Sequence, residues 1–274
     1  MTGALDWRAT LPDGFGWPDG IRAAACFTFD VDAESPILFD HPESASWLDV
    51  MSHQAYGPRT GVPRLLRILD RQRIRATFFV PGYTAERWPE VVRAVRDAGH
   101  EIGHHGYLHE GAHSAPDLET EESRLLRGLE ALDTVAGIRP VGYRGPMWEA
   151  SFGLPALLAR HGFRYDSGLM DADHPYRLAT GPERDAPSII ELPAHWSMDV
   201  WEPYNYLPVI TGSGVFASPA ELLARWTLEL GALVAEGGLF LLTHPPFLPG
   251  PASPPLARAT LLHRPQAIPA AWIY

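Results

Sequence analysis

Short apolar runs of β-type composition alternate along this chain with amphipathic helical patterns, and this alternation constrains the fold more than any other feature. Apolar side chains at Val62, Leu65 and Leu69, for example, recur at helical spacing between two such runs. Alternating strands and helices are typical of a parallel sheet joined by right-handed crossovers. The expected strands are residues 23–32, 76–80, 101–105, 140–144, 164–169, 188–193 and 239–243. These seven units predict a closed or nearly closed α/β barrel, with an open doubly wound sheet as the alternative.

Capping and stop signals bound the helices between these strands. Thr84 can cap a helix that runs to about residue 98, where Gly99 is a stop signal. No Gly-x-Gly-x-x-Gly motif follows the first strand and there is no P-loop, so no nucleotide-binding signature favours the doubly wound sheet. Further helical patterns cover residues 117–136, 154–161 and 219–235.

The chain is acidic, with 22 Lys and Arg residues against 33 Asp and Glu residues and a formal net charge of −11. Without a basic stripe it is a poor partner for nucleic acid, and a neutral or cationic substrate suits it better than a polyanion. It contains no run of about 18 apolar residues and no export signal, so we expect a cytoplasmic protein without a membrane partner. No linker divides the sequence, so residues 1–274 are expected to form one domain, with the proline-rich residues 249–274 as an irregular tail.

Chemically active side chains follow the expected strands at their carboxyl ends, which is where active sites gather in α/β barrels. Each alone has an ordinary interpretation, such as a surface salt bridge for Arg144 or a core position for His244. Acids, imidazoles and a guanidinium at five strand ends instead predict a catalytic site at one rim. In chain order these residues are Asp30, Asp32, His105, His109, Arg144, Asp199 and His244.

Three carboxylates lie within five residues of the first strand end. If the strand continues, Asp30, Asp32 and Glu34 share one face of the sheet. Carboxylates that close to one another require a cation or an arginine nearby if all are to ionise. The alternative is a solvated loop that is rich in acids.

Residues 100–113 hold five of the chain's twelve histidines. A His-x-x-x-His spacing places two imidazoles one helical turn apart, within reach of one metal ion. The spacing fits His105 with His109 and also His109 with His113, and a plain surface cluster is the alternative. Together with the aspartates, the histidines predict a His-His-Asp site for a divalent metal. Zn²⁺ suits this mixed donor set best, and Co²⁺, Ni²⁺ or Mn²⁺ also fit.

Aromatic residues near the expected rim could stack on a ring-shaped substrate, or could belong to the core instead. They are Trp148, Trp196, Trp201, Tyr204 and Tyr206.

Five short motifs, taken in order, resemble those of the polysaccharide deacetylase superfamily, also called the NodB-homology or carbohydrate esterase 4 group. They are Thr28-Phe29-Asp30-Val31-Asp32, His105-Gly106-Tyr107-Leu108-His109, Arg144-Gly145-Pro146, Asp199-Val200-Trp201 and Leu242-Thr243-His244. The resemblance covers about residues 17–247 and selects the His105/His109 pair. It implies a distorted (β/α) barrel of about seven parallel strands. The chain looks most like an intracellular branch that includes peptidoglycan deacetylase-like proteins and cyclic imide hydrolases. It departs from close relatives at Val200, where they carry a second acid, and in its proline-rich tail, where they have an amphipathic helix.

The resemblance implies roles for the residues at the first three motifs. Asp32, His105 and His109 would hold the metal ion, and Asp30 would be the catalytic base. Arg144 would pair with Asp30, orient it and keep its pKa low.

The remaining site residues would complete proton transfer and substrate binding. His244 would protonate the departing nitrogen, and Asp199 would fix the tautomer of His244 and raise its pKa. A backbone N–H near Met147 would help to stabilise the oxyanion. The side chains expected to contact the substrate are Glu34, Met147, Trp148 and Trp201.

Two substrate classes fit this chemistry. The first is an N-acetylated amino sugar that loses acetate, which the precedent of the family favours. The second is a small cyclic imide or amide that is opened by the same attack, which the absence of an export signal favours. A non-catalytic carbohydrate- or metal-binding module on the same fold is a third interpretation. Relatives on this branch often form homo-oligomers, so the resemblance implies that association as well.

Overall fold

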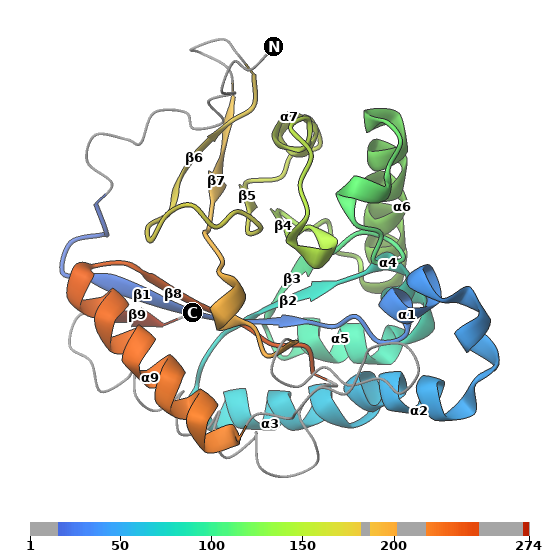
Figure 1. Ribbon diagram of the computed structural model, residues 1–274, viewed down its shortest axis with the longest axis horizontal. Coiled ribbons are helices and arrows are strands. Elements are labelled where there is room, and N and C mark those ends of the chain that lie inside the picture. The colour runs from blue at the N-terminus through green and yellow to red at the C-terminus, as the bar shows by residue number, and fades with distance from the viewer. Residues whose placement is uncertain (1–15, 182–186, 202–217, 247–270, 274) are drawn as a thin grey trace.

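The computed structural model describes residues 16–181, 187–201, 218–246 and 271–273, which build one curled sheet with helices packed against it (Figure 1). The strands lie in the order β6-β7-β5-β4-β3-β2-β1-β8, and β9 pairs with β1. Their bounds are β1 (Ala23–Asp30), β2 (Thr77–Val80), β3 (Glu101–His104), β4 (Gly142–Tyr143), β5 (Tyr165–Asp166), β6 (Tyr176–Ala179), β7 (Ser188–Glu191), β8 (Leu239–Thr243) and β9 (Ala271–Ile273).

All seven predicted strands are present. They pair in parallel with one another, as in a distorted (β/α) barrel. Two strands were not predicted. β6 pairs antiparallel with β7, and β9 lies within residues 249–274, for which we expected irregular structure. Among the described residues one isolated bridge, between Asp199 and Thr243, joins the segment after β7 to the end of β8. The sheet is therefore nearly closed at the carboxyl ends of its strands.

Alternation along β1 separates the two faces of the sheet. Phe27 and Phe29 point to the outer face, which is covered by helices. These helices are α3 (Val62–Gln72), α5 (Pro89–Asp97), α6 (Leu118–Ala136) and α9 (Pro219–Glu236). Burying one such phenylalanine contributes about 1.5–3 kcal/mol, so this layer supplies much of the stability of the fold. Thr28 and Asp30 alternate with them and point to the inner face, where the candidate site lies.

The helices agree with the sequence in most places. α3 (Val62–Gln72), α6 (Leu118–Ala136), α7 (Leu154–Arg160) and α9 (Pro219–Glu236) lie where they were expected. Residues 35–61 fold into α1 (Ser35–Asp40), the 3-10 turn Pro42–Ser46, α2 (Leu48–Tyr56) and the π-turn Gly57–Gly61, none of which was predicted. Three shorter 3-10 turns are Ala112–Ser114, Pro146–Trp148 and Trp196–Met198.

The expectation that Thr84 caps a single helix to about residue 98 is wrong. Two helices occupy this stretch, α4 (Gly82–Arg87) and α5 (Pro89–Asp97), because Pro89 fits only the first turn of a helix. Thr84 lies inside α4, and its hydroxyl donates to the main-chain oxygen of Asp32 at 2.7 Å. In the described part of the chain no helix is both long and apolar enough to cross a bilayer.

Candidate active site

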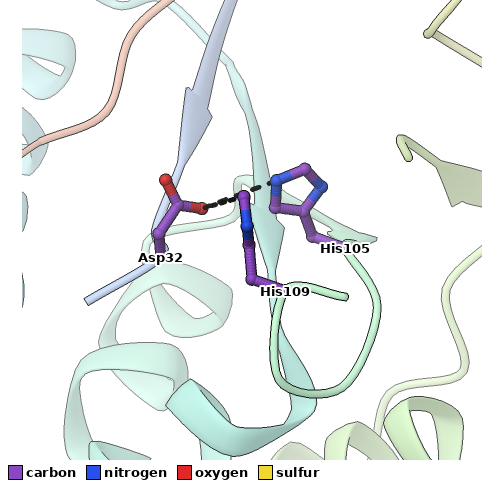
Figure 2. Close-up of side chains that lie close together, drawn as sticks. All are labelled: Asp32, His105 and His109. Atoms are coloured by element: carbon purple, nitrogen blue, oxygen red, sulfur yellow. Dashed lines mark ion pairs between the residues drawn. The ribbon is translucent and has the colours of Figure 1, made fainter. Parts of the chain in front are cut away.

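Asp32, His105 and His109 converge just beyond the ends of β1 and β3 (Figure 2). Asp32 Oδ1 lies 3.5 Å from His105 Nε2 and 3.9 Å from His109 Nε2. One donor atom from each of the three residues lies within 4.8 Å of the others, and all three residues are buried. His113, the alternative partner of His109, is instead 72% exposed at its side chain and faces Glu149. Of the two spacings, only that of His105 with His109 therefore brings both rings to Asp32.

The loop from His105 to His109 is not helical, so the premise of the spacing argument, that the two imidazoles lie one helical turn apart, is wrong. Gly106 has a φ of +70° and His109 a φ of +61°, and these two left-handed residues curl the loop back toward β1. A Cβ at Gly106 would lie 2.9 Å from the Pro146 side chain, so the loop also packs too closely for a larger residue. Left-handed non-glycine residues cost on the order of 1–3 kcal/mol and gather at functional sites.

The other strained residues support that interpretation. Of the five described non-glycine residues with positive φ, four belong to segments of this site, namely Ala33, His109, Met147 and Trp148. The surrounding packing must hold these conformations in place.

The two histidines have the protonation state that a divalent cation requires, and the buried Asp32 would gain from a neighbouring positive charge. Burial lowers the pKa of both His105 and His109 to about 3, so both rings are neutral at pH 7. His105 Nδ1 donates to the carbonyl of Arg144 at 2.8 Å, which leaves its Nε2 lone pair directed toward Asp32. Asp32 Oδ1 accepts no hydrogen bond from any described residue. Burial, reinforced by Asp30 and Asp199, raises the pKa of Asp32 well above its usual value. Two neutral imidazoles and an unsatisfied buried carboxylate fit a divalent metal ion, which would neutralise that carboxylate.

Arg144 is fully buried and directly contacts Asp30. Its Nη1 donates to Asp30 Oδ1 at 2.7 Å and to Thr28 Oγ1 at 2.9 Å. On the other side Nε donates to the main-chain oxygen of Ser167 and Nη2 to its hydroxyl, each at 3.1 Å. The guanidinium also lies over the ring of Phe79, 4.2 Å from its centroid.

The effect of Arg144 on the acidity of Asp30 is smaller than we expected. Its charge and hydrogen bond lower the pKa of Asp30, but burial raises this pKa by more. The net direction is upward, so the expectation of a low pKa is wrong for the chain taken by itself. Loss of hydration is the largest effect on this carboxyl group.

Asp199 and His244 lie on the side of the site formed by the segment after β7 and the end of β8. The bridge to Thr243 brings Asp199 beside the residue that precedes His244. Asp199 Oδ1 accepts the N–H of Trp201 at 2.9 Å, and burial raises the pKa of Asp199 to about 7. The main-chain N–H of His244 donates to Thr28 at 3.0 Å. His244 is therefore fixed to the same strand that carries Asp30.

The residues expected to contact substrate occupy varied positions. β1 ends at Asp30 and the chain turns at Ala33, so the expected strand face shared by Asp30, Asp32 and Glu34 does not form. Glu34 Oε2 accepts the indole N–H of Trp88 at 2.8 Å.

The aromatic residues divide between the core and the surface. Trp148 is buried and packs against the half-exposed Trp196, with 4.9 Å between the ring centroids. Met147 is half-exposed. Trp201 is partly buried and packs against the main core. Tyr204 and Tyr206 lie outside the described residues. Substrate contact by Glu34, Met147, Trp148 and Trp201 stays a prediction.

Comparisons with known proteins now bear on this geometry. The family model described as polysaccharide deacetylase matches residues 55–165. A peptidoglycan deacetylase from Helicobacter pylori is 32% identical over 220 residues, which cover 72% of this chain and 73% of that protein. The chain belongs to the polysaccharide deacetylase family.

Solved structures agree with this membership. A crystal structure from Mycobacterium smegmatis, described provisionally as a polysaccharide deacetylase, is 50% identical with a TM-score of 0.90 and covers 94% of this chain and 88% of its own. An allantoinase crystal structure is 23% identical with a TM-score of 0.77, over 94% of this chain and 89% of its own, and so shares the fold. The family model includes His105, His109 and Arg144 but not Asp30, Asp199 or His244.

Two further residues that support the candidate site were not predicted from the sequence. Ser167 directly follows β5, so its place at a strand end could have indicated it. His104 precedes the first metal-site histidine, and its ring joins α6 to the loop. Its Nε2 donates to Leu125 O at 3.0 Å and its Nδ1 accepts the Gly106 N–H at 3.1 Å. No sequence signal distinguishes this supporting histidine from its neighbours.

Proposed function

We propose that this member of the polysaccharide deacetylase family is a metal-dependent hydrolase that removes the acetyl group from an N-acetylated amino sugar. The single observation that carries the proposal is the buried Asp32–His105–His109 cluster beside the Asp30–Arg144 pair. The sequence identity of the chain with a peptidoglycan deacetylase supports the proposal that the bond cleaved is a carbon–nitrogen bond outside a peptide.

The metal would be held by Asp32, His105 and His109. A divalent ion, Zn²⁺ first and Co²⁺, Ni²⁺ or Mn²⁺ as alternatives, would polarise the amide carbonyl and lower the pKa of an attacking water. The second ring nitrogen of His105 is already fixed by the carbonyl of Arg144, which keeps this ligand in one tautomer.

Proton transfer would fall to the residues around Arg144 and His244. Asp30 would take the proton of the attacking water, with Arg144 Nη1 holding the carboxylate in one orientation. His244 would give a proton to the departing nitrogen. Asp199, beside the segment that carries His244, would favour the imidazolium form through its negative charge.

A second candidate function is the ring opening of a small cyclic imide or amide. The observation that favours it is burial, since Asp30, Asp32, His105, His109, Arg144 and His244 are each less than 8% exposed. A small planar substrate can be enclosed by such a site, whereas a polymer of sugars needs an open groove. The shared fold of an allantoinase is compatible with this reaction.

One experiment separates the candidates. Metal-loaded protein is assayed for acetate release from N-acetylglucosamine oligomers and for ring opening of succinimide, each with a chelated control. We expect chelator-sensitive acetate release. Chelator-sensitive ring opening alone would replace the first candidate by the second. Bound metal without turnover of either panel would favour the non-catalytic module.

We also propose that residues 1–274 form a single domain, because the sheet includes strands from Ala23 to Ile273. Limited proteolysis that released a stable internal fragment would contradict this.

A further inference from the structure

A pair of buried carboxyl groups lies under the site, on β5 and β7. Asp166 and Glu191 are direct partners across these parallel strands and are 1% and 0% exposed. Glu191 Oε1 accepts the main-chain N–H of Gly168 at 3.0 Å and that of Leu169 at 2.9 Å. Asp166 Oδ1 and Glu191 Oε2 accept hydrogen bonds from no other described group. Burial raises the pKa of both carboxyl groups, and the neighbouring Asp166 raises that of Glu191 further.

The segment that Glu191 holds is the one that holds Arg144. Residues 167–169 leave β5, and Ser167 presents both its carbonyl and its hydroxyl to the guanidinium. On its other side that guanidinium contacts Asp30. A continuous series of hydrogen bonds therefore leads from Glu191 through the main chain to the carboxylate proposed as the base.

We propose that Glu191, paired with Asp166, is a positioning residue that fixes Arg144 against Asp30. Glu191 touches neither the metal cluster nor Asp30, so its effect passes through the Ser167 segment. The kinetic part of this inference rests on the proposed function, but the placement of Arg144 does not.

The side-chain chemistry makes the inference specific. Glutamine at position 191 keeps the oxygen that accepts both N–H groups, and its amide can donate to Asp166. Aspartate keeps the carboxyl group but is one methylene shorter, so it cannot reach both N–H groups. If Glu191 has a positioning role, Glu191→Gln should change kcat little and Glu191→Asp should lower it. If the carboxyl group mattered through its charge, the two variants should show the reverse order.

The experiment compares Glu191→Gln, Glu191→Asp and Glu191→Leu with the matched control Glu121→Gln. Glu121 is another buried carboxylate, but it accepts a hydrogen bond from Ser151 and belongs to α6, away from Arg144. We expect Glu191→Asp and Glu191→Leu to lower kcat by roughly 10–100-fold with KM and metal content nearly unchanged, as for other residues that support a site indirectly. Glu191→Gln and the control should stay within about threefold of the wild type. Equal loss in Glu191→Gln and Glu191→Asp would overturn the proposal.

A second measurement needs no substrate. Arg144 Nε–H is buried and bonded to Ser167, so its hydrogen exchanges slowly, and its nitrogen-15 NMR signal is assigned by its loss in Arg144→Lys. We expect slow exchange in wild type and Glu191→Gln, and fast exchange in Glu191→Asp. If wild type turns over no substrate but this pattern holds, the proposed function fails while the positioning role stands. Slow exchange of the Arg144 Nε–H hydrogen in Glu191→Asp refutes the positioning role, whatever the activity of that variant. If Glu191→Leu does not fold, Glu191→Asp alone carries the test.

Discussion

The candidate site has two parts that the fold builds in different ways. The metal triad, Asp32, His105 and His109, follows β1 and β3, which flank β2 above the main hydrophobic core. The residues proposed for proton transfer, here called the proton-transfer group, are Asp30, Arg144, Asp199 and His244. Arg144 follows the two-residue strand β4, Asp199 lies in the segment after β7, and His244 follows β8. One bridge, between Asp199 and Thr243, connects the last two segments. Metal binding and proton transfer should therefore be separable by mutation.

The largest effect is expected in the metal triad. His105→Ala should remove stoichiometric metal and lower kcat/KM by more than about 10⁴-fold, because polarisation of the carbonyl and activation of water are lost together. Metal analysis of the purified protein, followed by the acetate assay, checks this. His113→Ala is the control, since His113 is exposed at the surface, and it should keep both metal and activity. Full metal content in His105→Ala would remove the triad from consideration.

The next effect isolates the proton-transfer group. Asp30→Asn should keep its metal and reduce kcat by about 10²–10³-fold, because the amide keeps the shape of the carboxylate but cannot accept the proton. Metal content and kcat are measured on the same sample. Loss of metal in this variant would show that the two parts of the site are not separable.

A third prediction concerns pH and the support beneath the proton-transfer group. Burial raises the pKa of Asp166 to about 7, whereas an unfolded aspartate titrates near 4. Between these values the folded state binds more protons, so the free energy of unfolding should fall as pH rises from about 4 to 7, by up to roughly 4 kcal/mol. Urea unfolding of wild type and Asp166→Asn at several pH values tests this. The variant should show the smaller decrease, and an equal slope would contradict the assignment.

The smallest effect is expected at His104, which supports the metal triad. His104→Phe keeps the stacking on Tyr143 but removes the hydrogen bonds to Leu125 and Gly106. Metal affinity should fall by roughly 10-fold, because the loop between the two ligands loses its anchor. Competition with a chelator of known affinity measures it. His161→Phe, at a partly buried position on a different segment, should leave the affinity unchanged.

Elements with a long regular pattern could be predicted from the sequence, and short or interrupted ones could not. The central strands β1, β2 and β8 are short, nearly continuous buried runs, and the long helices repeat apolar residues every 3.6 positions, so the positions of both follow from local pattern. Residues 35–61 are interrupted by Pro42, Gly57 and Pro58, and no period extends far enough to predict α1 and α2. β9 and β6 were missed for a related reason, since each is short and depends on a partner strand for its structure.

The residues of the candidate site could be predicted from the sequence, but the contacts between them could not. Position after a strand identified Asp32, His105 and Arg144, and the family resemblance chose His109 as the partner. The curled loop that joins the histidines depends on left-handed angles at Gly106 and His109, which spacing alone does not predict. Glu191 contacts the main-chain N–H groups of Gly168 and Leu169, and such contacts leave no pattern in the sequence.

The pairing of β1 has a consequence for how the protein is made. β1 is the first strand of the described chain, yet its residues pair with β8 and with β9 more than 200 positions later. Contacts of such long range form late, because their loop-closure entropy must be overcome first. On the ribosome, the strand that leads to Asp32 must wait for β8 and β9 to emerge before these neighbours are in place. Until then, its apolar outer face and unpaired edge are surfaces that a chaperone would recognise.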